Sequence, residues 1–168
     1  IAGGVIAQFR PEGLASPTAA DTRRFYNSPD VAMFNDIKQN RRFLSISIGS
    51  GYRAHPLNLD AADRFYSLRD PNVFNSLTQD EYDAITPITE SELVDISGKV
   101  AVTLTSADAG WMLTLPDNEM VLADSVTFND ELFFVSFSPD SAGAQACNVG
   151  QGTNFLYRVN ILNGDPIV

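Results

Sequence analysis

Residues 42–48 read Arg-Phe-Leu-Ser-Ile-Ser-Ile, and residues 131–137 read Glu-Leu-Phe-Phe-Val-Ser-Phe. A related motif precedes each stretch: Asp-Val-Ala-Met-Phe-Asn-Asp starts at Asp30, and Asp-Ser-Val-Thr-Phe-Asn-Asp starts at Asp124, an offset of 94 residues. After a polar loop, each copy continues with a third similar motif, Arg-Phe-Tyr-Ser-Leu-Arg-Asp or Asn-Phe-Leu-Tyr-Arg-Val-Asn. Four-stranded propeller blades recur about every 40–50 residues, so the offset fits two blade periods. The repeat therefore predicts part of a β-propeller.

The composition is that of a globular protein. Of 168 residues, 44% are hydrophobic and 19% charged, which is enough apolar material for a core. The net charge of −10 argues against a nucleic-acid partner and against docking on anionic lipid. No apolar stretch approaches the ~18 residues of a spanning helix, so no membrane insertion is expected. Since the chain starts at Ile1 and shows no signal peptide, we expect a single segment, residues 1–168, of a longer chain.

Strand patterning dominates the chain. Within residues 42–48 the side chains alternate between two faces, with Leu44, Ile46 and Ile48 on one of them. The opposite face carries Phe43, Ser45 and Ser47. Further strands are predicted at residues 5–9, 30–34, 64–68, 99–105, 111–115, 125–128, 132–137 and 154–161.

Turn and helix signals complete the fold class. Asn129 and Asp130 are predicted to join two strands in a hairpin, and a turn is expected at Asn35 and Asp36. Two capping-box patterns, Thr-Gln-Asp-Glu from residue 78 and Thr-Glu-Ser-Glu from residue 89, predict two brief helical turns. The prediction is an all-β chain, a partial β-propeller with short helical insertions between blades.

Cys147 is the single cysteine, so no disulfide forms within the chain. Three interpretations stay open: a small buried or inert residue, a partner cysteine outside this segment, or a catalytic thiol. The catalytic reading is the least supported, because the one histidine, His55, lies in a distant loop and a reactive thiolate needs a basic neighbour.

Enzyme signatures are weak. A lone histidine excludes a multi-histidine zinc site, and Pro56 after His55 indicates a structural turn. Gly49-Ser50-Gly51 lacks the Gly-Lys pair of a phosphate loop and is interpreted as a tight blade corner. We predict no catalytic residue, no metal site and no cofactor.

Two further groups of side chains could be functional, but we interpret both as structural. Acidic residues that could pair as glycosidase carboxylates are expected to be solvated faces of short helices: Asp80, Glu81, Asp83, Glu90, Glu92 and Asp95. Aromatic residues on the C-terminal strands are expected in the core: Phe133, Phe134, Phe137, Phe155 and Tyr157.

One run is specific enough to indicate a family. Residues 48–58 read Ile-Gly-Ser-Gly-Tyr-Arg-Ala-His-Pro-Leu-Asn, and Asp-Arg-Phe-Tyr follows from Asp63. This run resembles the C-terminal region of PilY-type proteins, large secreted factors associated with type IV pilus tips and pilus biogenesis. The resemblance extends over residues 23–166, through Arg69-Asp70-Pro71, Arg24-Phe25-Tyr26, Pro29 to Ala32, Leu93-Val94-Asp95, Gly110 to Leu115, Cys147, Gly150, Gly152, Thr153, Leu156-Tyr157 and Asn163-Gly164.

The resemblance implies a modified propeller of quinoprotein-like shape, whose closing blades this segment supplies. It also implies a role in type IV pilus assembly, in balancing extension against retraction, and in surface adhesion. The implied location is extracellular, at the pilus tip, after passage through periplasm and outer membrane. The implied partners are minor pilins or other pilus components and the remainder of the propeller. If the propeller is incomplete, an apolar blade face is left exposed.

Family members carry a calcium loop of the Asp-x-Asp/Asn-x-Asp type, which this sequence lacks. The nearest stretch, residues 58–63, reads Asn-Leu-Asp-Ala-Ala-Asp and is missing both the turn glycine and the distal glutamate. No Arg-Gly-Asp tripeptide occurs either. The sequence therefore does not identify the residues that bind a partner.

Two alternatives remain for the function. Quinoprotein dehydrogenases share the blade shape and a final turn like the one at Asn163 and Gly164, but they need an Asp base, calcium and often adjacent cysteines. A generic extracellular propeller scaffold or binding module is the other alternative. Bound quinone, detected by its absorbance, would identify the enzyme.

Overall fold

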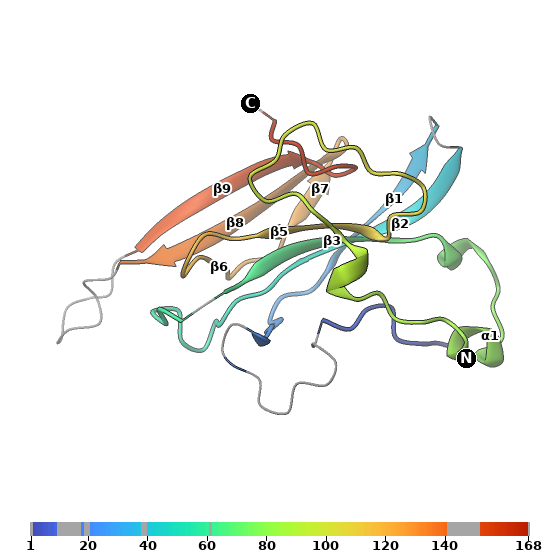
Figure 1. Cartoon of the computed structure of the whole chain (residues 1–168), viewed down its shortest axis with the longest axis horizontal. Helices are drawn as coiled ribbons and strands as arrows, with labels where there is room; N and C mark the ends of the chain where they lie inside the picture. Colours follow the sequence, from blue (N-terminus) through green and yellow to red (C-terminus); the bar gives the residue numbers. More distant parts are fainter. Residues whose placement is uncertain are drawn as a thin grey trace.

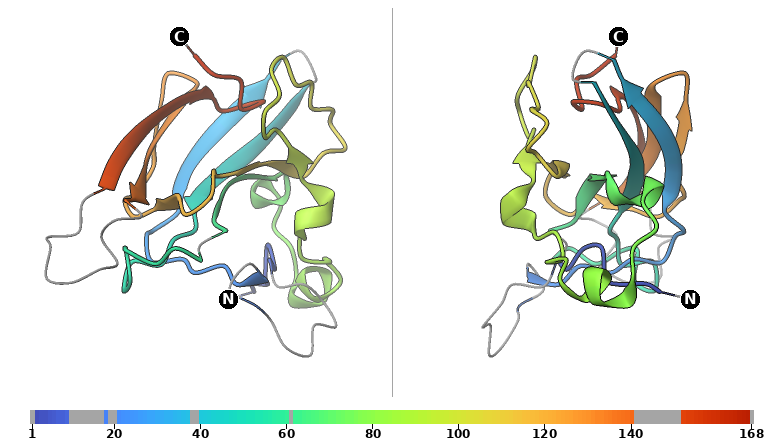
Figure 2. Two further views of the ribbon diagram at one scale, coloured as in Figure 1. Left: turned by 60° about the vertical axis from the view of Figure 1, so that its left-hand side comes forward. Right: turned by 90° about the vertical axis from the view of Figure 1, so that its right-hand side faces the viewer.

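Two β-sheets that pack face to face make up most of the protein (Figures 1 and 2). The structure, a computed structural model, describes residues 2–9, 18, 21–37, 40–60, 62–140 and 152–167. The first sheet has the strand order β1-β2-β3-β5-β4, in which the β4-β5 pair is parallel and the other pairs are antiparallel. Its strands are β1 (Asp30–Asp36), β2 (Arg41–Gly49), β3 (Arg64–Asp70), β5 (Gly110–Thr114) and β4 (Val94–Asp95).

The second sheet is built around one long strand, β8 (Glu131–Pro139). One edge of β8 pairs with β9 (Gly152–Asn160) along its whole length. The other edge pairs with two short strands, β6 (Met120–Val121) and β7 (Val126–Phe128). All of these pairs are antiparallel. Besides the two sheets the described chain has only short helical turns, so it is all-β, as predicted.

The sequence repeat corresponds to a structural repeat. The first copy is the antiparallel meander β1-β2-β3, and the second is the meander β7-β8-β9. The two copies lie in adjacent sheets that share one core, so the interpretation of 94 residues as two blade periods is wrong. In the described part of the chain the two sheets are open and close no ring.

The predicted turns and helices are largely confirmed. Both capping boxes form, at the starts of α1 (Gln79–Asp83) and of the 3-10 turn η3 (Glu90–Glu92). The hairpin residues Asn129 and Asp130 have φ angles of 52° and 63°, as a tight turn between two twisted strands requires. A further 3-10 turn, η2 (Asn72–Phe74), follows β3.

Several predicted strands and turns are wrong. Residues 99–105 form no strand, and residues 5–9 contribute only one bridge, between Ala7 and Ile88. β1 continues through the expected turn to Asp36, because it pairs with β2 down to Arg41. Cys147 lies outside the described residues.

The core between the sheets is aromatic at its centre. The Phe134 ring on β8 stacks on two neighbours: Phe65 of β3, with 3.9 Å between centroids, and Tyr157 of β9, at 4.6 Å. Trp111 on β5 is fully buried and donates its indole N–H to the carbonyl of Ile161 at 2.9 Å. Aromatic stacking and apolar burial therefore hold the sheets together.

Small residues let the sheets approach where the aromatic residues end. The face of β2 that meets the second sheet carries Ser45 and Ser47, both buried, and the two hydroxyls lie 3.1 and 3.5 Å from that of Ser67 on β3. Beyond them, the backbone N–H of Val121 in β6 donates to the carbonyl of Ser50 at 2.9 Å. The serines thus satisfy each other's polar groups while keeping the spacing short.

The opposite face of the first sheet is covered by the chain itself. Tyr66 and Leu68 of β3 are buried there with Leu93, and Ile46 and Ile48 pack beside them. The Phe9 ring stacks on Tyr66 at 4.1 Å between centroids. A second small core therefore fixes the N-terminal segment and residues 86–93 on this face.

The outer face of the second sheet has no cover in the described part of the chain, and apolar side chains lie there beside the Glu131–Arg158 ion pair. Paired residues share a face, so Val126 lies beside Phe133, and Val135 beside Leu156. Phe128 and Leu156 are 73% and 69% exposed. Of the five C-terminal aromatics expected in the core, Phe134 is buried there and Tyr157 packs against it. The expectation is wrong for Phe155, which is 43% exposed, and Phe133 and Phe137 lie half-buried on the outer face.

Replacing Gly51 by alanine tests the close approach of the sheets. A Cβ on Gly51 would lie 2.2 Å from the carbonyl oxygen of Val121, so backbone must move. Overpacking of this kind costs about 1–3 kcal/mol, and we expect G51A to lower the free energy of unfolding in urea by that amount. G3A is the matched control, because its added Cβ meets no atom within 4 Å. Equal stability of the two variants would contradict this packing.

Candidate functional site

The family-specific run of residues 48–58 leaves β2 and forms a loop at one end of the first sheet. The loop is tied down at its start, where Ser50 N donates to the carbonyl of Arg64 and Gly51 N donates to the carbonyl of Arg24, both at 2.9 Å. Gly49 and Gly51 both face Val121, and an added Cβ on either would collide with it. Packing against the second sheet therefore explains the glycines, which form no open phosphate cradle.

Beyond these anchors the loop presents an aromatic and cationic surface. The guanidinium of Arg24 lies 3.9 Å from the centroid of the Tyr52 ring, and the His55 ring meets the same tyrosine edge-on at 4.7 Å. Two consecutive turns hold the loop, from His55 N to Tyr52 O at 2.8 Å and from Asn58 N to His55 O at 3.0 Å. Arg53 and His55 are exposed, so this cluster can bind a partner by stacking and by charge.

Asp63 lies beneath the loop and is buried. Its carboxylate accepts a hydrogen bond of 2.6 Å from the hydroxyl of Ser50, which in turn accepts one of 3.0 Å from Arg64 N. Burial raises the pKa of the Asp63 carboxyl, against the opposing effects of Ser50, Arg23 and Arg24. Of the stretch weighed as a calcium loop, Asn58 accepts a hydrogen bond from Asp60 N at 2.8 Å, and Asp63 is bonded to Ser50.

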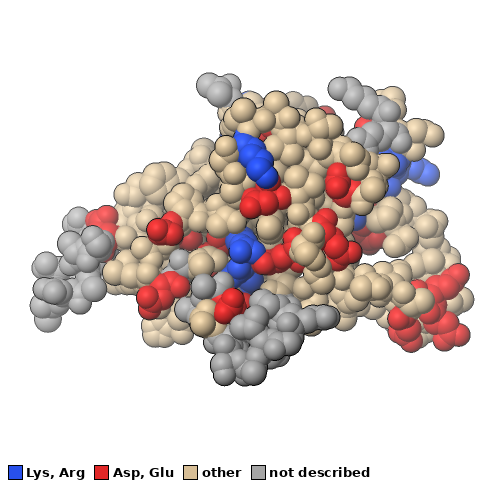
Figure 3. Space-filling model, viewed as in Figure 1, with Lys and Arg blue, Asp and Glu red and all other residues tan. Residues whose placement is uncertain are grey.

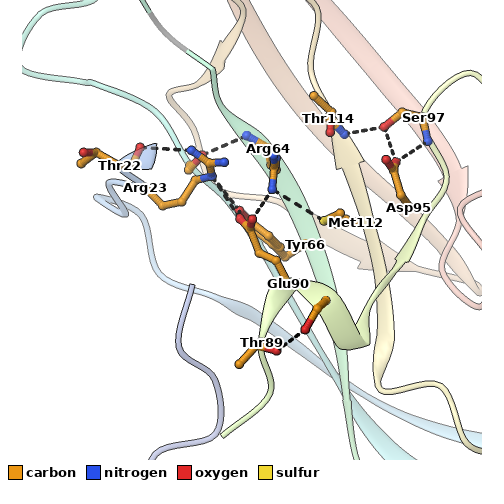
Figure 4. A network of polar contacts seen from close by, with 12 residues as sticks. Thr22, Arg23, Arg64, Tyr66, Thr89, Glu90, Asp95, Ser97, Met112 and Thr114 are labelled. Carbon is orange, nitrogen blue, oxygen red and sulfur yellow. Dashed lines mark hydrogen bonds and ion pairs between the residues drawn. The ribbon is translucent and has the colours of Figure 1, made fainter. Parts of the chain in front are cut away.

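Glu90 is the hub of a half-buried polar network on the outer face of the first sheet (Figure 4). Its carboxylate receives Nε of Arg23 at 3.2 Å, and it also receives Nη1 of Arg64 and the hydroxyl of Tyr66. Burial, together with the hydrogen bond to Glu90, raises the pKa of the Tyr66 hydroxyl, so the phenol stays protonated. The network joins the N-terminal segment, β3 and η3, three segments far apart in the sequence.

A second polar contact set lies beside this network. Asp95 accepts hydrogen bonds from the backbone N–H and the hydroxyl of Ser97, at 2.9 and 2.5 Å, and Ser97 in turn receives Thr114 N at 2.8 Å. Figure 4 shows this set next to the Glu90 network, on the ends of β4 and β5. These hydrogen bonds link the ends of β4 and β5, and Ser97 occupies the Asp95 carboxylate.

The acidic residues expected as solvated helix faces have three different environments. Glu81 and Glu92 close the capping boxes, and an acidic patch of Asp80, Glu81 and Asp83 covers the region of α1 in Figure 3. The expectation is wrong for Glu90, because two arginines and Tyr66 enclose it. It is also wrong for Asp95, which lies on β4 and not on a helix. Sequence reasoning missed the role of Glu90, since its partners come from residue 23 and from β3, with no local signal.

The described residues contain no group of three or more His, Cys, Asp or Glu side chains placed to hold a metal ion. They also contain no helix long and apolar enough to cross a membrane.

The comparisons with known proteins match this chain to a solved structure. No family model matches the sequence, and no curated protein matches it. Among solved structures, the chain is similar to the C-terminal domain of PilY1 from Pseudomonas aeruginosa, with a TM-score of 0.64 at 12% sequence identity. The match covers 98% of this chain and 36% of the solved one, so this chain spans about a third of that length. The PilY-type resemblance is thus confirmed in the fold.

Substituting Glu90 by glutamine tests the network. The variant keeps the shape of the side chain but leaves Arg23 and Arg64 without their carboxylate, and hydrogen bonds to charged groups contribute about 1.5–3 kcal/mol. We expect E90Q to lower the free energy of unfolding by about that amount in chemical denaturation. E131Q breaks one ion pair, with Arg158, whose side chain is 44% exposed, so it should have a smaller effect. An equal or larger loss in E131Q would refute the hub role.

A pH series on D63N tests the burial of Asp63. Because burial raises the folded-state pKa above the usual 3.8, ionisation of Asp63 weakens the fold as the pH rises through that pKa. The stability of D63N relative to the parent should therefore increase from about pH 3 to pH 6.

The control for this series has the opposite sign. Hydrogen bonds from the backbone and hydroxyl of Thr78 lower the pKa of Glu81, so its stabilising effect is present above 4.5 and is lost as the pH falls through its folded pKa. E81Q should therefore lose stability relative to the parent as the pH rises. Unfolding midpoints across the pH range measure both, and parallel trends would rule out the assignment.

Proposed function

We propose that this chain is part of a PilY-type factor that acts in type IV pilus assembly. The observation that carries the proposal is the likeness of fold to the PilY1 C-terminal domain over 98% of the chain. The sequence resemblance of residues 48–58 to PilY-type proteins also supports it, and Gly49 and Gly51 of that run pack against Val121 of the second sheet.

We further propose that residues 1–168 supply closing blades of a modified β-propeller. The two three-stranded repeats pack face to face, as neighbouring blades do, and the outer face of the second sheet exposes large apolar side chains beside the Glu131–Arg158 ion pair. Phe128 and Leu156 would be buried on that face by another blade of a longer protein. The solved chain is nearly three times as long as its matched part, which leaves material for such blades.

The same proposal gives the chain a binding role and no catalytic one. His55 packs against Tyr52, Asp63 is hydrogen-bonded to Ser50, and Glu90 is enclosed by its arginines. The exposed loop with Tyr52 and Arg53 offers a surface for minor pilins or for an adhesion target at the tip. The factor would reach this place through the periplasm and outer membrane and would influence the balance of extension and retraction. No specific observation favours the quinoprotein alternative.

Sheared surface fibres from the source bacterium test the function. Mass spectrometry of fibres from the parent strain and from one lacking the major pilin would follow tryptic peptides such as residues 54–64. We expect these peptides with the fibres and their loss from the sheared fraction without pilin. Equal amounts in periplasm or medium in both strains would contradict a pilus association, and a quinone absorbance in the purified protein would favour the enzyme instead.

A further inference from the structure

The strand β9 lies at the edge of the second sheet, and one of its two sides is open along most of its length (Figure 1). The other side pairs with β8 from Gly152 to Asn160. On the open side, the only strand pairing within the described residues is a single antiparallel bridge between Val159 and Pro166. An open strand edge presents unpaired N–H and C=O groups, to which a further strand can pair.

The C-terminal segment, residues 165–167, begins such a pairing. Two backbone hydrogen bonds flank the bridge. Asn160 N donates to the carbonyl of Asp165 at 2.8 Å, and Ile167 N donates to the carbonyl of Arg158 at 3.0 Å. This is the hydrogen-bond pattern of two antiparallel strands. The C-terminal segment is therefore the start of a strand that runs back along the open side of β9.

The same hydrogen bonds show which backbone groups of β9 are left over. The N–H and C=O of one residue point to the same side of a strand, and successive residues point to opposite sides. Arg158 and Asn160 point to the open side, and the register with β8 is unbroken, so Asn154 and Leu156 also point to the open side. Among the residues that the structure describes, no strand pairs with the backbone groups of Asn154 and Leu156.

The exposure and composition of β9 agree with an edge that another strand covers. Residues 153–156 are all exposed, although one face of the strand lies against the core. Phe155 shares that face with the buried Ser136 and is still 43% exposed. Natural proteins protect free edges with charged residues or proline, and residues 152–157, Gly-Thr-Asn-Phe-Leu-Tyr, contain neither.

The C-terminal segment also determines which strand can take this position. Because Pro166 lies opposite Val159 in an antiparallel register, the chain beyond Ile167 is directed along β9 toward Leu156. A strand from another source would have to end where residues 165–167 already lie. The continuing chain needs no new loop, since the turn before Asp165 is already formed, so it loses the least entropy on pairing.

We propose that the chain that continues beyond Ile167 in the longer protein forms a fourth strand of this sheet, antiparallel to β9 and paired with the backbone groups of Leu156 and Asn154. The inference rests on the proposed function, in which this chain is part of a longer protein. The repeat β7-β8-β9 would then become a four-stranded antiparallel meander, the strand number of a propeller blade.

A functional consequence follows for the partners of the protein. Strand addition to an open edge is a common way to bind an extended peptide segment. An edge of β9 that is filled by the protein's own chain cannot bind a pilus component in this way. The loop with Tyr52 and Arg53 then remains the candidate binding surface of this part of the protein.

Amide hydrogen exchange, resolved by residue, tests the alternation along β9. In the 168-residue chain the amides of Phe155 and Tyr157 face β8 and should exchange slowly, whereas those of Asn154 and Leu156 should exchange at least about 100-fold faster. In the longer protein all four amides should exchange slowly, because each has a strand as its partner. Equal rates for Asn154 and Leu156 in the two proteins would overturn the proposal.

Proline variants separate a paired edge from a covered face. N154P removes an N–H on the open side of β9, and T153P removes the adjacent N–H, which faces β8. Both side chains are exposed, so T153P is a matched control. In the 168-residue chain we expect T153P to lower the melting temperature by several degrees and N154P by clearly less.

In the longer protein the two proline variants should lower the melting temperature equally, because N154P then also breaks a strand pair. A smaller fall for N154P in the longer protein as well would contradict the fourth strand. The exchange rates of the unaltered proteins decide the question if T153P does not fold.

These outcomes are separable from that of the proposed function. Absence of the peptides from sheared fibres would refute the pilus role and leave the exchange pattern unaffected. Fast exchange of Leu156 in a longer protein that is found on the fibres would refute the fourth strand alone. Burial of the Phe128 side chain reports instead on a neighbouring blade, because Phe128 lies on β7, on the other side of β8.

Discussion

The close approach of the two sheets at Ser50 and Val121 is the constraint on which the structure depends. One backbone hydrogen bond joins them there, and both flanking positions of Ser50 must be glycine. Because the sheets touch at this point, Phe65 and Phe134 can stack in the core behind it. The same contact sets the direction in which the loop of residues 51–58 leaves the sheet, so the packing of the core places the candidate binding surface.

The faces of the two sheets are covered to different extents. The faces that meet are filled by aromatics and small serines, and the far face of the first sheet is covered by residues 86–93 and the N-terminal segment. The far face of the second sheet remains apolar and exposed at Phe128 and Leu156. Large exposed apolar side chains grouped on one face are typical of an interface, and in the proposed propeller the next blade would cover them.

Local patterns predicted the parts of this fold that local chemistry determines. The alternation in β2, the hairpin at Asn129 and both capping boxes follow from neighbouring residues. Burial could not be predicted in the same way, because Ser45 and Ser47 are buried for the space they leave, while the more apolar face of β2 lies in the smaller core. The partners of Glu90 likewise come from distant segments, so no spacing in the sequence could indicate them.

Hydroxyl-radical footprinting tests the central proposal, that this chain supplies two adjacent blades of a larger ring. The oxidation of Phe128 and Leu156 would be compared between the 168-residue chain and the longer protein, with the exposed Tyr26 as an internal reference. The account predicts strong oxidation of both residues in the short chain and protection in the longer one, at unchanged Tyr26 oxidation. Equal oxidation of Phe128 and Leu156 in both proteins would contradict it.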